Sequence, residues 1–112
     1  AGGTVNKNTF TFTPDETGEY YVFVMNKKVK TVKAELPTGQ KSFSNVDRGY
    51  LLELGTLAPG TEVKLTADEA GEQLNAIAYR FSEDAMIQVY DRLNQSPMHL
   101  TSWKGMDRKS GW

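Results

Sequence analysis

Hydrophobic and polar residues alternate along much of the chain, which is the pattern of half-buried β-strands. In residues 9–13, Phe10 and Phe12 fall on one face, with threonines between them. Residues 19–25 carry apolar side chains on both faces, which predicts a central strand that is covered on both sides. Further strand patterns lie at residues 29–36, 49–54, 62–66 and 73–81.

Turn-forming residues separate these strand segments. Pro14 fixes φ, Asp15 can bond the local backbone and Gly18 permits positive φ, so together they predict a turn between the first two strands. The segments 37–39 and 59–60 divide later strands in the same way. Short strands joined by such turns predict a mainly β fold, an antiparallel β-sandwich of jelly-roll or immunoglobulin-like type.

The hydrophobic period changes after Ser82. The next apolar residues are spaced i, i+3, i+4 and i+7, which is one face of a helix: Met86, Val89, Tyr90 and Leu93. Ser82 is a good N-cap, and the two acidic residues after it suit the positive end of a helix dipole. We therefore expect one packed α-helix near residues 83–95, followed by a closing strand at residues 98–103.

The length of 112 residues predicts a single domain that can bury a core without disulfide bonds. We expect residues 9–105 to form the sandwich, with its C-terminal helix and closing strand. Residues 1–8 are expected to be a linker or a cloning scar, and residues 106–112 a cut tail.

Composition excludes several kinds of chemistry. The absence of Cys removes disulfide bonds, thiol nucleophiles and thiolate metal sites. Thirteen basic and fourteen acidic residues give a net charge of −1, so the total charge provides no attraction to nucleic acid or to an anionic membrane surface. We expect a monomer that does not bind nucleic acid.

Few residues are candidates for catalysis or metal binding. His99 is the single histidine, too few for a zinc site without Cys, and no nucleophile-elbow pattern lies near it. Two acidic clusters, at residues 15–19 and 68–72, lack the spacing of a calcium loop; solvated turns are the simpler interpretation, and calcium binding is the alternative. We predict no catalytic residue, no metal site and no cofactor.

Aromatic residues are the remaining candidates for a ligand site. Their flat faces can cover the apolar side of a sugar ring. Tyr20, Tyr21 and Trp103 are the predicted sugar-stacking residues, although burial in the core or at an interface is the commoner role of such side chains.

Three segments carry a resemblance to a known family: GEYYVFV, LLELGTLAPGTEVKL and AYRFSEDAMIQVYDRLNQSPMHLTSWKG. Over residues 18–105 the chain resembles the extracytoplasmic C-terminal region of the YfhO family of bacterial membrane proteins. Members of this family resemble glycosyltransferases that use lipid-linked sugars, and they are associated with glycosylation of Gram-positive cell-wall polymers such as lipoteichoic acid.

The resemblance implies a soluble piece at the extracellular face of the bacterial cell membrane. Its expected partners are the membrane core of the parent protein and a cell-wall glycan or polymer. No residue matches the family's presumed catalytic acid, so the resemblance implies a non-catalytic accessory domain. A free-standing carbohydrate-binding or adhesion module is the alternative, and a small hydrolase is a third hypothesis.

Overall fold

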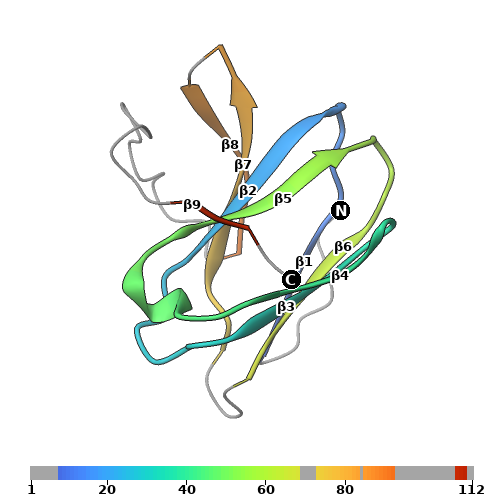
Figure 1. The fold of residues 1–112 in the computed structure, drawn as a ribbon. Helices are drawn as coiled ribbons and strands as arrows, with labels where there is room; N and C mark the ends of the chain where they lie inside the picture. The colour runs from blue at the N-terminus through green and yellow to red at the C-terminus, as the bar shows by residue number, and fades with distance from the viewer. Residues whose placement is uncertain (1–7, 69–72, 84, 93–107, 111–112) are drawn as a thin grey trace.

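Two β-sheets that pack face to face make up the fold (Figure 1). The computed structural model describes residues 8–68, 73–83, 85–92 and 108–110. One sheet has four strands in the order β1-β6-β3-β4, and the other has five in the order β8-β7-β2-β5-β9. The strands are β1 (Thr9–Phe12), β2 (Gly18–Val24), β3 (Val32–Leu36), β4 (Gly39–Phe43), β5 (Leu51–Leu57), β6 (Val63–Ala67), β7 (Ala76–Ser82), β8 (Ala85–Asp91) and β9 (Arg108–Ser110).

All strand pairs are antiparallel except β5 and β9, which are parallel. One short 3₁₀ helix, η1 (Val46–Arg48), lies between β4 and β5, and the described residues include no α-helix. The mainly β, antiparallel character predicted from the alternating pattern is confirmed.

Strand β2 is the central strand of the five-stranded sheet. It pairs with β5 on one side and with β7 on the other, so that Val22 lies between Leu52 and Ala78. Val22 is fully buried between the sheets, and Tyr21, on the opposite face, is 6% exposed. The two-sided burial predicted for residues 19–25 is therefore confirmed.

The core between the sheets is built from alternate residues of both sheets. The four-stranded sheet contributes Phe10, Val32, Phe43 and Leu65, and the five-stranded sheet contributes Tyr20, Val22, Leu52 and Ala78, among others. These side chains are almost completely removed from water, and their burial provides most of the driving force for folding.

A bulge adjusts β5 to the central strand. Tyr20 pairs with Gly55 and Tyr21 with Glu53, which leaves Leu54 as an extra residue. Gly55 has a φ of 90°, a conformation that favours glycine, as is common at bulges.

The structure contradicts the packed helix expected near residues 83–95 over the part of this segment that it describes. Residues 85–91 form β8, an antiparallel neighbour of β7 in the five-stranded sheet (Figure 1). Leu93 and the strand expected at residues 98–103 lie outside the described residues.

A second bulge explains why this strand resembles a helix in sequence. Gln88 pairs with Tyr79 and Tyr90 pairs with Ala78, so Val89 is the extra residue. The insertion shifts the alternation by one, and as a result Met86 faces outward while Val89 and Tyr90 pack on the inner core. Apolar residues at i, i+3 and i+4 therefore lie on a bulged strand.

The segment expected to be a tail contributes to the sheet. Arg108–Ser110 form β9, which pairs in parallel with Leu51, Leu52 and Glu53 of β5.

Contacts between β8 and β1 close one side of the two-sheet structure. The ring of Tyr90 meets that of Phe10 edge-on, with centroids 5.2 Å apart. The Arg92 guanidinium donates hydrogen bonds to the backbone carbonyl oxygens of Thr9 and Leu74. The bond to Thr9 joins the end of β8 to the first residue of β1, in the other sheet.

We predict that Phe10→Ala lowers the free energy of unfolding by about 3–5 kcal/mol, because Phe10 is 1% exposed and its removal leaves a cavity. Ile87→Ala on β8 should cost no more than about 1 kcal/mol, because Ile87 is 42% exposed. Urea midpoints of the two variants provide the comparison, and equal losses would contradict this packing.

Candidate functional site

The outer face of the five-stranded sheet carries a second apolar cluster, which we call the outer-face cluster. Its centre is buried and consists of Tyr21, Leu51, Ile77 and Tyr79. Its rim is half-buried and consists of Phe23, Met25, Phe81 and Met86. The cluster arises because β2 and β7 have apolar residues at successive positions, so that both of their faces are hydrophobic.

The outer face of the other sheet is polar. Lys33 and Glu35 of β3 and Lys64 of β6 are exposed there, between residues that face the core. Apolar and polar residues alternate in this way along a strand that has one face on the core and one face exposed to solvent. On the five-stranded sheet, by contrast, the centre of the outer-face cluster is almost completely removed from water, and Arg108 of β9 forms a hydrogen bond with one of its members, Tyr21. The five-stranded sheet thus has the composition of a sheet that is covered on both faces.

A hollow of about 280 Å³ adjoins the rim of this cluster at the end of β2. Its walls come from the end of β2 and from η1, and the lining includes Phe23, Met25, Lys27, Asp47 and Arg48. An apolar floor with charged groups around it can hold a small group that has one apolar face and several polar substituents.

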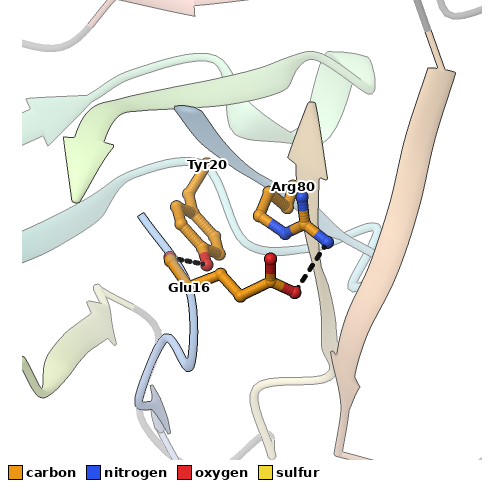
Figure 2. Close-up of polar contacts among 3 residues, drawn as sticks. All are labelled: Glu16, Tyr20 and Arg80. Carbon is orange, nitrogen blue, oxygen red and sulfur yellow. Dashed lines mark hydrogen bonds and ion pairs between the residues drawn. The ribbon is translucent and has the colours of Figure 1, made fainter. Parts of the chain in front are cut away.

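Tyr20, one of the predicted sugar-stacking residues, lies in the inner core and is 0% exposed. Figure 2 shows that its hydroxyl donates a hydrogen bond of 2.5 Å to the backbone oxygen of Glu16. The Glu16 carboxylate in turn accepts a hydrogen bond of 3.2 Å from Arg80 of β7. Sugar stacking by Tyr20 does not fit this position, since the ring has no free face; the residue instead fixes the turn between β1 and β2.

The other two predicted residues are placed differently. Tyr21 is in the outer-face cluster, where burial raises the pKa of its hydroxyl, and a hydrogen bond with the Arg108 side chain acts in the opposite direction. Trp103 lies outside the described residues. Its role stays a prediction, and the structure does not bring the three together as one described site.

Tyr79 is a polar feature of the outer-face cluster that sequence reasoning does not single out. It is 1% exposed, and its hydroxyl has no hydrogen-bond partner in the described structure. Its strand partner Gln88 has a buried side-chain oxygen that is also unpaired there. Burial, with a smaller contribution from Asp91, raises the pKa of Tyr79. Buried polar groups normally have a hydrogen-bond partner. The Tyr79 hydroxyl and the Gln88 side-chain oxygen are exceptions to this rule within the sheet.

The geometry favours recognition over catalysis. In the described ranges no three His, Cys, Asp or Glu residues come together as metal ligands. The groups whose pKa is raised there are three tyrosines, all shifted mainly by burial. His99 lies outside these ranges. What the described residues offer is an apolar surface with a few polar groups.

No family model, curated protein or solved structure matches the chain. The part of the chain that the structure describes contains no helix long and apolar enough to cross a membrane.

Two Tyr→Phe substitutions should have opposite effects. Tyr79→Phe should raise the free energy of unfolding by up to about 1 kcal/mol, because it removes a buried hydroxyl that has no described partner. Tyr20→Phe should lower it by about 0.5–1.5 kcal/mol, because it removes the bond to Glu16. Urea unfolding measures both changes, and a destabilised Tyr79→Phe variant would reveal a partner for that hydroxyl.

Stability should decrease in alkali. Burial raises the pKa of Tyr20, Tyr21 and Tyr79 above the ordinary value of 10.0. The unfolded chain therefore loses these protons at lower pH than the folded chain, so stability is complete below about pH 10 and falls as pH rises further. Urea midpoints at about pH 8 and pH 11 test this, and the decrease should be smaller in Tyr79→Phe. Equal midpoints at the two pH values would contradict it.

Proposed function

We propose that the chain is a non-catalytic, extracellular accessory domain of a YfhO-like membrane glycosyltransferase that acts on cell-wall polymers of the lipoteichoic acid type. In this proposal it is a β-sandwich of jelly-roll or immunoglobulin-like type at the extracellular face of the bacterial membrane. The sequence resemblance over residues 18–105 supports the family, and the two antiparallel sheets agree with the kind of domain that it implies.

The outer-face cluster is the observation that carries an accessory role. The centre of this cluster is already removed from water within the chain, and the half-buried rim, which includes Met25 and Met86, is the part that a partner can cover. Aromatic and Met side chains are enriched in protein interfaces. Their natural partner in this proposal is the membrane core of the parent protein.

A free-standing carbohydrate-binding or adhesion module is the second candidate. The hollow beside η1 supports it, because the half-buried Phe23 lies next to Asp47 and Arg48. An aromatic ring can cover the apolar face of a sugar, and the two charged groups can bond its hydroxyls. In this case the ligand would be a soluble glycan.

The accessory role predicts that the double variant Phe81→Ser, Met86→Ser binds the detergent-solubilised membrane part of the parent protein at least about tenfold more weakly, through the loss of apolar interface area. Ile87→Ser is the control, since Ile87 follows Met86 on β8, points away from the rim by the alternation of the strand and is 42% exposed. Thermal melting checks that each variant is folded.

Equal binding by the double variant and the control would contradict an interface at the rim. Saturable binding of a soluble oligosaccharide that Phe23→Ala abolishes would favour the second candidate instead. The coding sequence that flanks this chain also discriminates: a series of apolar helices supports the accessory domain, and a run of repeated modules supports the free-standing one.

A further inference from the structure

The near-zero net charge conceals a separation of charge between the two ends of the molecule. At one end, the β2–β3 connection and η1 carry four cations, which we call the basic end: Lys27, Lys28, Lys30 and Arg48. All four are exposed. The described acids at this end are Asp47, next to Arg48, Asp68, whose carboxylate accepts a hydrogen bond from the backbone N–H of Thr31, and Asp91, which pairs with Ile77 at the end of β8.

The opposite end of the strands is acidic. The β1–β2 turn, the start of β2, the β5–β6 connection and the β7–β8 turn supply exposed carboxylates at Asp15, Glu16, Glu19, Glu62 and Glu83. A bond from the Gly60 N–H to the Pro14 oxygen, 2.9 Å long, holds two of these connections together. Arg80 is bound to Glu16 and offsets one of the charges.

The connection that carries the lysines is held in place by the fold. Val29, between Lys28 and Lys30, is 0% exposed and belongs to the inner core. The backbone oxygen of Lys30 accepts a hydrogen bond of 2.9 Å from Val46 of η1. Asn26 donates to the Gln73 oxygen and accepts from the Asn75 N–H, each at 2.7 Å. The lysines therefore extend from a fixed base.

Apolar side chains lie beside two of these four cations. Lys27 and Arg48 line the same hollow as the half-buried Phe23 and Met25. The lysine ammonium is a point charge on a flexible side chain, without the fixed fork of donors by which arginine binds one phosphate or carboxylate group. Lysines therefore suit a surface with many anionic groups better than a single anionic ligand. Cations around a small apolar area match a lipid surface, which attracts basic residues electrostatically and accepts apolar side chains.

We propose that the basic end docks on the surface of an anionic lipid bilayer. The acidic end is repelled by the same surface, so the molecule would stand with its strands directed away from the bilayer. The charge distribution carries this inference whatever the parent protein is.

Cosedimentation of the 112-residue chain with vesicles tests the inference. Binding is expected to vesicles of phosphatidylcholine with about one-third phosphatidylglycerol, and not to phosphatidylcholine alone; it should weaken as salt rises. Lys27→Gln, Lys28→Gln should reduce the affinity by about 25-fold, since each basic residue near such a surface contributes roughly fivefold.

Single changes give the matched comparison, because Lys28→Gln and Lys64→Gln alter the net charge equally. Lys64 lies on β6 between Thr11 and Glu35, on the outer face of the other sheet and away from the basic end. Lys28→Gln should weaken binding by about fivefold and Lys64→Gln much less. Equal losses in the two single variants would overturn the inference. So would no binding to the anionic vesicles, or binding that millimolar inorganic phosphate abolishes at constant ionic strength. The result is independent of the rim variants, which test the accessory role.

Discussion

The burial of β2 on both of its faces is the constraint on which the rest of the structure depends. Its inner residues, such as Val22, join the core between the sheets, and its outer residues, such as Tyr21, form the centre of the outer-face cluster. β5 and β7 are held on either side of it. β8 and β9 extend the sheet from those neighbours, and therefore every strand of this sheet is positioned directly or indirectly by β2.

The two outer faces of the molecule consequently differ. The four-stranded sheet presents charged residues to water, whereas the five-stranded sheet presents the outer-face cluster and, at its end, the hollow beside η1. This asymmetry links the fold to both proposals. A rim of aromatic and Met side chains suits a protein partner, and the basic end beside the hollow suits an anionic surface. The two surfaces adjoin each other through Phe23 and Met25.

Sequence patterning predicts the strands well where apolar and polar residues alternate regularly, as in β1, and where a short segment is apolar on both faces, as in β2. It fails at β8, because the bulge at Val89 shifts the alternation and produces helix-like spacing. Tyr20 and Tyr21 are equal candidates in sequence, and only the packing shows that the first is enclosed in the inner core. The charge separation is also hidden from composition, since the total of −1 does not record which turns share an end of the molecule.

Hydrogen exchange of the backbone amides is the most direct test of the central position of β2. If β2 supports both faces, the amides of Tyr20 to Val24 should exchange only through global unfolding, with a free energy equal to that from urea unfolding. The edge strand β4, which has one neighbour among the described strands, should exchange at lower free energy through local opening. Exchange of the β2 amides by local opening, at a free energy no higher than that of β4, would contradict the account.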